Sequence, residues 1–301
     1  MQRKILYFIN PISGTKNITA TLELIKKRTT QQQIPFNIAH TNAEGNYLFL
    51  PKKITTEAIT DIVVCGGDGT VSQVAAALLG IDINIGIIPM GSGNGLALAA
   101  KIPAKINKAL DIIFTGKAAY VDSFYLNDKF SCMLCGMGLD AQVAHDFAKQ
   151  SSRGLATYIK QSVRNFILAK PYPFTIINKG NSFLTDAYFI SIANSNQFGN
   201  QLTIAPKASL QDGLLDIVVV KKMPKLRMLV AVITQILAGE INNEVDKTFH
   251  QKELVYFQTD RLCILNTAMA PLHIDGDPAK SQEKIVVKII PRAFKLIQPY
   301  G

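Results

Sequence analysis

The stretch DIVVCGGDGTVSQVAAALLG at residues 61–80 sets the organisation of the first half of the chain. Its short β-branched run from Ile62 to Val64 is typical of a strand buried on both faces. Apolar residues recur at helical spacing from Val71 to Leu78, which predicts a helix beginning just after Thr70. The turn between strand and helix contains three glycines: Gly66, Gly67 and Gly69. Such glycines are expected to adopt positive φ and to let a bound group approach the backbone.

One carboxylate, that of Asp68, lies inside this glycine turn. A glycine turn that leads into a helix presents unpaired N–H groups and the positive end of the helix dipole, which is typical of a phosphate site. A carboxylate there would repel a phosphate, so we predict that a divalent metal lies between Asp68 and the phosphate. The alternative interpretation is that Asp68 is only a turn residue.

The order of strand, turn-rich loop and helix occurs three times in the first 115 residues. This alternation predicts a mostly parallel sheet with helices on both faces. Loops at the carboxyl ends of such strands line the ligand crevice, so the three loops are expected to converge: Asn10–Gly14, Gly66–Thr70 and Gly91–Gly95. None of them is a Walker A or a dinucleotide-binding motif. Without a P-loop lysine, phosphate charge would be neutralised by metal and backbone donors.

The sequence changes character near Tyr120, after which short β-type runs alternate with turn residues. This pattern predicts an antiparallel sandwich or a barrel-like domain, interrupted by helices around 139–168 and 225–239. The second half holds the acidic candidates Asp122, Asp140, Asp212, Asp216, Asp275 and Asp277. A carboxylate in the tight turn at 275–277 can be aimed as a general base, and Asp277 is the candidate. A plain turn is the alternative, and His273 is interpreted as structural.

Composition limits the partners. The 301 residues carry a net charge of +10, which favours an anionic partner such as a nucleotide, an anionic bilayer surface or a nucleic acid. No base-reading motif accompanies the charge, so nucleic acid is not expected. The four cysteines are interpreted as reduced structural thiols of a cytosolic protein, since Cys132 and Cys135 lack the further ligands of a zinc site.

Membrane contact is expected to be peripheral. The apolar run at the N-terminus is too short for a signal sequence, and the apolar helix candidate from Met228 to Gly239 is too short to span a bilayer. Residues 151–170 form a basic amphipathic helix pattern. Such a helix can lie on anionic lipid headgroups, or it can be a surface helix whose apolar face packs on the core.

A series of motifs carries a resemblance across nearly the whole chain. They are Asn10-Pro11-x-Ser13-Gly14, Gly66-Gly67-Asp68-Gly69-Thr70, Pro89-x-Gly91-Ser92-Gly93-Asn94, Gly136-x-Gly138-Leu139-Asp140, Ala193-Asn194-Ser195, Ala205-Pro206-x-Ala208, Asp212-Gly213-Leu214-Leu215-Asp216 and Asp275-Gly276-Asp277. In this order they resemble the diacylglycerol kinase catalytic domain family, which includes bacterial soluble lipid kinases, sphingosine kinases and ceramide kinases. The Gly-Gly-Asp-Gly-Thr motif alone is shared with NAD kinases and phosphofructokinases.

The resemblance implies an α/β fold with two domains. Residues 1–120 would form a Rossmann-like ATP-binding domain of the NAD kinase and diacylglycerol kinase type. Residues 121–301 would form an antiparallel β-sandwich domain for the lipid substrate, with the last residues packing back on the first domain. ATP and Mg²⁺ would be the cofactors, bound in the cleft.

The resemblance also assigns site residues by motif position. Asp277 and Asp68 would be catalytic. Contacts to ATP or its metal would come from Asn10, Pro11, Ser13, Gly14, Thr41, Gly66, Gly67, Asp68, Gly69, Thr70, Gly91, Ser92 and Asn94. Metal-side residues would be Asp68, Asp122 in an acidic network, and Asp212 with the backbone carbonyls of Ser209 and Leu214.

Two positions depart from the family pattern. Bacterial diacylglycerol kinases usually have aspartate after the asparagine of the third loop, where this chain has Gly95. The family's base is the glutamate of an Asp-Gly-Glu turn, where this chain has Asp277. Asp68 is therefore expected to carry more of the metal-side task, and it is the alternative base.

The predicted function is an ATP- and Mg²⁺-dependent lipid kinase that phosphorylates a hydroxyl of diacylglycerol, a sphingoid base or a ceramide-like lipid. The alternatives are an NAD kinase-like enzyme with a soluble substrate and a non-catalytic nucleotide-binding module. The protein is expected to be cytoplasmic and to contact an anionic membrane surface, and a homodimer is one oligomeric state that the sequence allows.

Overall fold

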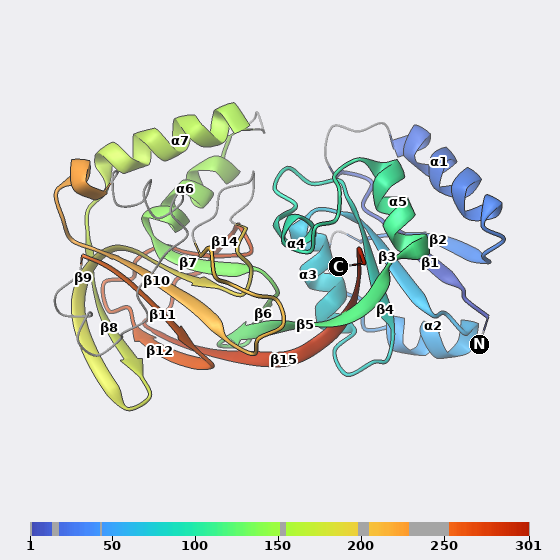
Figure 1. Ribbon diagram of the computed structural model, residues 1–301. Coiled ribbons are helices and arrows are strands. Elements are labelled where there is room, and N and C mark those ends of the chain that lie inside the picture. Colours follow the sequence, from blue (N-terminus) through green and yellow to red (C-terminus); the bar gives the residue numbers. More distant parts are fainter. Residues whose placement is uncertain are drawn as a thin grey trace. The chain divides into compact units, whose positions relative to one another are not determined.

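The computed structural model describes residues 2–13, 18–42, 44–150, 155–197, 205–228 and 253–300 (Figure 1). The chain divides into two compact units. The first unit consists of Met1–Asp122 with Pro291–Gly301, and the second unit is Ser123–Ile290. The boundary falls inside two long strands, β5 (Lys117–Leu126) and β15 (Lys284–Gln298).

The first unit is built on a parallel sheet. Its strands are β1 (Ile5–Ile9), β2 (Phe36–His40), β3 (Asp61–Gly66) and β4 (Asn84–Pro89). They lie in the order β2-β1-β3-β4, and the end of β15 pairs in parallel with β4. Every residue of β1 and β3 is buried, as the unbroken apolar runs predict. This confirms the parallel α/β part of the predicted fold.

Helices cover both faces of this sheet. They are α1 (Ile18–Gln31), α2 (Leu50–Glu57), α3 (Asp68–Ala77), α4 (Gly95–Ala99) and α5 (Ile106–Thr115). On one face Tyr7 donates to or accepts from Thr29 of α1 (2.8 Å), and Arg28 links α1 to Asp111 of α5. On the other face Phe8 packs against Phe49, which precedes α2. In Figure 1, α1 and α5 accordingly lie together, and α2 lies across the strands from them.

The second unit is an antiparallel β-sandwich, as predicted. Its further strands are β6 (Lys129–Ser131), β7 (Leu134–Gly138), β8 (Tyr172–Asn178), β9 (Asn181–Ala193), β10 (Leu215–Lys221), β11 (Leu254–Thr259), β12 (Arg261–Leu265), β13 (Leu272–Ile274) and β14 (Asp277–Ala279). The first half of β9 pairs with β8, and its second half pairs with β7 and β10. Side chains from these strands meet in one apolar core that includes Phe124, Phe174 and Phe257.

Two helices of the second unit, α6 (Leu139–Ala148) and α7 (Leu155–Leu168), pack on each other. The other predicted helix, around 225–239, lies mostly outside the described residues. Within the part of the chain that the structure describes, no helix is long and apolar enough to cross a membrane. Cys65, Cys132 and Cys135 are buried free thiols, and burial raises the pKa of Cys65 and of Cys135.

Candidate functional site

Three loops leave the parallel sheet of the first unit at the carboxyl ends of β1, β3 and β4. Backbone hydrogen bonds continue past the strands, because the N–H of Asn10 donates to Cys65 O (3.0 Å) and that of Met90 donates to Gly66 O (2.9 Å). The loops therefore start side by side, as the strand–loop–helix pattern predicts.

The glycine turn after β3 differs from its sequence-based description. The helix α3 begins at Asp68 rather than after Thr70, and Gly67 is its N-cap with φ of −95°. None of the three turn glycines has positive φ, so that expectation is wrong. The turn needs glycine for space. A Cβ on Gly66 would lie 2.9 Å from the Cβ of Thr70 in the first turn of α3.

The second and third loops touch backbone to backbone. A Cβ built on Gly91 would lie 2.6 Å from the Cα of Gly67, a distance that real side chains do not reach. A Cβ on Gly67 would lie 3.1 Å from the Cα of Gly91. Glycine at both positions therefore lets the loops after β3 and β4 form one continuous surface.

A side-chain bond ties the first loop to the second. The Asn10 amide donates through Nδ2 to Thr70 Oγ1 (2.9 Å), while its Oδ1 accepts the N–H of Ile12 (3.1 Å). Asn10 thus shapes its own loop and holds it against the start of α3. The predicted contact role of Asn10 and Thr70 toward ATP stays a prediction, and the structure assigns them this bond to each other.

Asp68 ties the second loop to the third. Its Oδ2 accepts the N–H of Gly95 (3.0 Å) and its Oδ1 accepts the N–H of Leu96 (3.3 Å). A carboxylate at the start of a helix satisfies backbone donors and complements the helix dipole. The carboxylate that the sequence places in a phosphate-binding turn is therefore directed at the first turn of α4.

Asn94 closes the third loop on itself. It adopts the left-handed conformation (φ 53°), accepts the N–H of Gly91 through Oδ1 (2.8 Å) and donates through Nδ2 to Gly91 O (2.7 Å). Both ends of its amide are thus engaged within the loop. The side chain of Asn94 thus shapes the third loop, and its predicted contact with nucleotide stays a prediction.

The remaining predicted nucleotide residues lie around these loops. Pro11 and Ser92 are exposed, and Ser13 is half-buried with its N–H donating to Asn10 O (3.3 Å). The N–H of Thr41, after β2, donates to Ile9 O (2.9 Å) at the end of β1. The turn residue Gly69 belongs to the first turn of α3. Gly14 lies outside the described residues.

The three loops contain one carboxylate, that of Asp68, which suits a magnesium ion that phosphate oxygens also bind. Mg²⁺ keeps several waters and takes only one or two carboxylates in nucleotide sites. In the structure, each oxygen of Asp68 accepts one backbone N–H group at the start of α4. No group of three or more His, Cys, Asp or Glu side chains suited to a metal occurs within the described ranges.

The turn that carries the predicted base lies between β13 and β14 in the second unit. Asp275 and Gly276 are its two central residues, with φ of 49° and 85°, and Ile274 pairs with Asp277 across it. Positive φ at both central residues defines the turn type favoured in two-residue hairpins. Asp277 is therefore the last residue of the four-residue turn and the exposed first residue of β14.

Asp275 anchors this hairpin. Its buried carboxylate accepts the Ser131 hydroxyl (2.6 Å). It also accepts three consecutive backbone N–H groups, those of Cys132 (3.3 Å), Met133 (3.1 Å) and Leu134 (3.2 Å). The sequence placed Asp275 among the acidic candidates without a role. Its Asp-Gly pair between two β-type runs was the available signal, since it marks these two residues as the centre of the turn.

A buried His–Asp pair supports the same hairpin from the other side. His273 on β13 is 1% exposed, and its Nε2 lies 3.4 Å from Asp140 Oδ2 in the first turn of α6. The N–H of Gly276 donates to Nδ1 of the ring (3.3 Å). Nδ1 is thus the acceptor, so the ring proton lies on Nε2 and faces Asp140. Burial raises the pKa of Asp140, and the contact with His273 opposes that rise.

Gly136 on β7 makes room for this pair. A Cβ at Gly136 would lie 1.8 Å from Asp140 Oδ2 and 2.6 Å from His273 Nε2. The Gly136-x-Gly138-Leu139-Asp140 motif therefore places its aspartate against the strand that leads to Asp277. Sequence reasoning treated His273 as structural and gave Asp140 no partner, because the contact joins segments more than 130 residues apart.

Replacing His273 by Asn or by Gln tests separately the contact of the ring with the Gly276 N–H and its contact with Asp140. Asn keeps an acceptor near the position of Nδ1, whereas Gln reaches Asp140 and leaves the Gly276 N–H without an acceptor. Each variant is expected to lose about 1–3 kcal/mol of stability, because each leaves a buried polar group unpaired. Only His273→Gln should lower kcat, about 10-fold or more, since it alone frees the turn before Asp277.

Thermal unfolding and steady-state kinetics of the two variants check this expectation. Similar unfolding temperatures with unequal kcat values would show that the ring positions the hairpin. Equal losses of kcat in both variants would contradict a separate positioning role for the contact with Gly276.

The remaining predicted metal-side residues lie in two places. Asp122, in the first unit, is buried and accepts the N–H of Arg292 (2.7 Å). Asp212, before β10 in the second unit, is exposed and accepts the N–H of Leu214 (3.0 Å). Ser209 Oγ accepts the N–H of Gln211 (3.3 Å). The carbonyl roles of Ser209 and Leu214 toward a metal stay predictions.

A second carboxylate, that of Asp216, accompanies Asp212. Asp216 is fully buried, and Gln258 Nε2 donates to both of its oxygens (3.3 Å each). Burial raises its pKa to about 7, and the negative charge of Asp212 adds to the rise, while the hydrogen bond from Gln258 lowers it. The Tyr256 hydroxyl also donates to Asp216 Oδ1. The metal role of the 212–216 turn stays a prediction.

Comparison with known proteins agrees with both halves of the chain. Residues 4–126 match the model of the diacylglycerol kinase catalytic domain. Residues 134–298, more than half of the chain, match the model of the YegS C-terminal NAD kinase beta sandwich-like domain.

Relatives and solved structures cover nearly the same span. The chain is 25% identical to the diacylglycerol kinase of Bacillus subtilis (strain 168) over 91% of this chain and 89% of that protein. It is 26% identical to a "probable lipid kinase YegS-like" of Yersinia enterocolitica, over 91% of this chain and 90% of that protein. A diacylglycerol kinase structure from Bacillus anthracis (strain Sterne) shares the fold, with a TM-score of 0.75, 19% identity and coverage of 98% and 97%. A diacylglycerol kinase catalytic domain followed by a YegS-type β-sandwich domain places this chain in the bacterial diacylglycerol kinase and YegS-like lipid kinase family.

Proposed function

We propose that the chain is a lipid kinase that transfers the γ-phosphoryl group of ATP to a hydroxyl of a lipid, with Mg²⁺ as the metal. One observation carries the proposal. The three loops at the carboxyl ends of β1, β3 and β4 are tied together by the Asn10–Thr70 bond, the Gly67–Gly91 contact and the Asp68 carboxylate. Glycine-containing loops held together in this way at the carboxyl ends of parallel strands suit a polyphosphate, and family membership supports kinase chemistry.

None of the three loops has the Gly-Lys-Ser/Thr sequence of a P-loop, so we expect metal and backbone donors to offset the phosphate charge. When bound, Mg²⁺ would neutralise charge on the transferred group, and Asp68 would hold it together with phosphate oxygens. Asp277 would accept the proton of the lipid hydroxyl or orient it. Its exposure at the start of β14 leaves the carboxylate accessible to a substrate.

The test is a transfer assay with a panel of acceptors. Purified protein is incubated with γ-labelled ATP, Mg²⁺ and, in separate reactions, diacylglycerol, a sphingoid base, ceramide and NAD. Label is expected in at least one lipid and not in NAD. Label in NAD alone would assign the NAD kinase-like alternative, and ATP binding without any transfer would indicate a nucleotide-binding module. An Asp68→Asn preparation made in parallel controls for contaminating kinases.

A further inference from the structure

A fourth loop leaves the parallel sheet of the first unit at the same edge as the three loops of the candidate site. It follows β2 and comprises residues 41–49, all of which except residue 43 the structure describes. The N–H of Thr41 donates to Ile9 O (2.9 Å) at the end of β1, and the first loop begins with the next residue, Asn10. The fourth loop therefore starts beside the first loop, at the carboxyl ends of two neighbouring parallel strands.

Hydrogen bonds within the fourth loop hold its shape. Asn42 Nδ2 donates to Asn46 O (2.8 Å), and the N–H of Asn46 donates to Asn42 Oδ1 (3.1 Å). Asn46 Oδ1 also accepts the N–H of Leu48 (3.2 Å). Side-chain amides that bond the nearby backbone in this way fix a turn. The loop also packs on α3, because a Cβ on Gly45 would lie 2.9 Å from Cδ of Gln73.

Tyr47 anchors the fourth loop on the sheet. Its side chain is buried (2% exposed), and its ring packs edge-on against Phe8 of β1, with the ring centroids 5.2 Å apart. The backbone oxygen of Tyr47 accepts the N–H of Leu50 (2.9 Å) at the start of α2. The ring is thus held from the strand and from the helix, so its hydroxyl has a fixed place in the loop.

The Tyr47 hydroxyl lies beside the beginning of the same loop. Burial raises the pKa of Tyr47, and the Asn42 N–H and the Thr41 hydroxyl, which lie near the Tyr47 oxygen, oppose that rise. Neither contact has the geometry of a full hydrogen bond, and Tyr47 Oη is among the buried side-chain atoms of the described residues that lack a partner. Buried polar atoms are nearly always bonded, since an unsatisfied one costs free energy. A small movement of the Thr41 side chain that completed this bond would therefore be favourable.

The donors and acceptors of this group decide where the Thr41 proton points. Tyr47 stays protonated at neutral pH, because its pKa is raised. The Asn42 N–H can only donate, so the Tyr47 oxygen is its acceptor, and the Tyr47 proton is left for Thr41 Oγ1. Thr41 Oγ1 then accepts from Tyr47, and its own proton is left for an acceptor outside the loop. A ligand at this edge of the sheet supplies such an acceptor.

The order of the strands indicates which part of a nucleotide reaches the fourth loop. The strands lie in the order β2-β1-β3-β4, so the fourth loop is at one end of the row of loops, next to the set that suits the polyphosphate. The nucleoside is attached to one end of the polyphosphate and therefore lies at one end of this row. At the other end, the Asn94 amide is engaged within its own loop. The fourth loop, with a directed hydroxyl, is the end that suits the nucleoside.

We propose that Tyr47 is a positioning residue of the nucleotide site, which donates to Thr41 Oγ1 and directs the Thr41 proton at an acceptor atom of the nucleoside. The inference rests on the proposed function, because it names the part of ATP that the fourth loop holds. Tyr47 does not touch the nucleotide, and its hydroxyl gains a full hydrogen bond when Thr41 engages the ligand. Removing that hydroxyl therefore weakens nucleotide binding without weakening the fold.

Calorimetric titration of the full chain with ATP and Mg²⁺, in the absence of lipid, measures this effect. Tyr47→Phe is expected to raise the Kd for ATP about 5- to 10-fold, the size of one hydrogen bond gained on binding. Its unfolding temperature is expected to be no lower than that of wild type, because the hydroxyl that it removes has no full hydrogen bond. Inorganic triphosphate with Mg²⁺ has no nucleoside, so wild type and Tyr47→Phe should bind it equally well.

Tyr7→Phe is the matched control in the same sheet. The Tyr7 side chain is fully buried, and its hydroxyl shares a complete hydrogen bond with Thr29 Oγ1 of α1 (2.8 Å). This substitution is expected to lower the unfolding temperature by about 2–4 °C and to leave the Kd for ATP unchanged. The two tyrosines thus predict opposite outcomes, a loss of affinity at Tyr47 and a loss of stability at Tyr7.

A double variant tests whether Tyr47 acts through Thr41. Thr41→Val removes the hydroxyl and keeps the shape of the side chain, and it is expected to raise the Kd for ATP about 10-fold. Thr41→Val combined with Tyr47→Phe should bind ATP no more weakly than Thr41→Val alone, because the Tyr47 hydroxyl has no role once the Thr41 hydroxyl is absent.

Three results would overturn the assignment of Tyr47. They are a Tyr47→Phe variant with the Kd of wild type for ATP, additive losses of affinity in the double variant, and an unfolding temperature lowered as much as in Tyr7→Phe. Equal weakening of ATP and triphosphate binding by Tyr47→Phe would overturn the assignment of the fourth loop to the nucleoside. Wild-type protein that does not bind ATP would instead overturn the proposed function, so the two failures can be told apart.

Discussion

Asp68→Asn is expected to lower kcat for lipid phosphorylation about 100- to 1,000-fold, the effect of removing one group that stabilises developing charge in a phosphoryl-transfer site. The amide keeps the size of the side chain and one acceptor oxygen, but it loses the negative charge that would hold Mg²⁺ beside the phosphates. No second carboxylate follows Asn94 to share that task, since Gly95 stands there. Steady-state kinetics over a range of Mg²⁺ concentrations measures the loss.

The structure also predicts a separate, smaller effect of this substitution on stability. Asp68 accepts the N–H groups of Gly95 and Leu96 with its two oxygens, and an amide can accept only with one of them. The lost bond is expected to cost about 1–2 kcal/mol of unfolding free energy. Asp111→Asn makes the same chemical change on α5 in the first unit, at a surface ion pair, and should alter neither kcat nor stability appreciably.

Two outcomes at Asp68 would contradict its proposed role beside the metal. A variant that keeps its kcat would remove the metal-side role and leave Asp68 as the tie between the second and third loops. A variant that loses activity only in proportion to unfolded protein would indicate the same. Because the tie and the charge reside in one side chain, the Mg²⁺ dependence of the remaining activity separates them.

The strands and loops of the first unit were predictable because each leaves a local signal. Buried parallel strands appear as unbroken apolar runs, and glycine-rich turns mark their carboxyl ends, so the order of the elements follows from the sequence. The reason for the glycines was not local. Gly67 and Gly91 are 24 positions apart, and only the packed loops show that each excludes a Cβ of the other.

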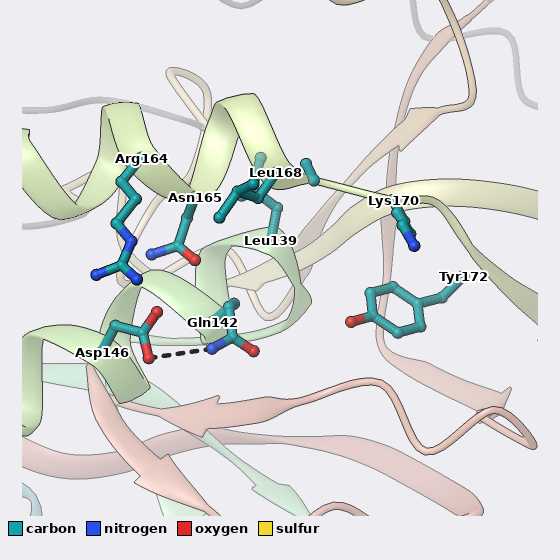
Figure 2. Close-up of a pocket in the computed structure, with 9 residues that line it drawn as sticks. Leu139, Gln142, Asp146, Arg164, Asn165, Leu168, Lys170 and Tyr172 are labelled. Carbon is teal, nitrogen blue, oxygen red and sulfur yellow. Dashed lines mark hydrogen bonds between the residues drawn. The ribbon is translucent and has the colours of Figure 1, made fainter.

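The candidate site was predictable to the level of motifs and not to the level of contacts. Asp68 was recognised as an unusual carboxylate, but its bonds to the start of α4 depend on how two loops meet. Asp275 and Asp277 differ by two positions in the sequence, and pairing in the hairpin makes one a buried anchor and the other an exposed end. For α7 the helical period was clear, whereas the hydrogen bond that joins Asn165 of α7 to Asp146 of α6 (Figure 2) has no local signal in the sequence.

Asp277→Asn is expected to lower kcat about 100- to 10,000-fold, the range typical of removing a general base, while the affinity for ATP is unchanged. Asp277 is the exposed first residue of β14, so the substitution leaves the core intact and should change stability by no more than about 0.5 kcal/mol. Asp128→Asn, on the exposed turn between β5 and β6, is the matched control and should leave kcat unchanged.

Asp277→Glu tests the same assignment in the opposite direction. The longer side chain brings back the glutamate of the family's Asp-Gly-Glu turn, and the hairpin that carries it is held independently by Asp275 and His273. The carboxylate therefore keeps its anchor point and gains one methylene of reach, so kcat should be retained within about 10-fold of wild type or rise above it. If Asp277→Asn and Asp277→Glu both keep wild-type kcat, proton acceptance does not occur at this position, and Asp68 becomes the remaining carboxylate to carry it. If Asp277→Asn and Asp277→Glu lower kcat to the same extent, the base role stands. The reaction then requires a carboxylate at the reach of an aspartate side chain, and one added methylene is not tolerated.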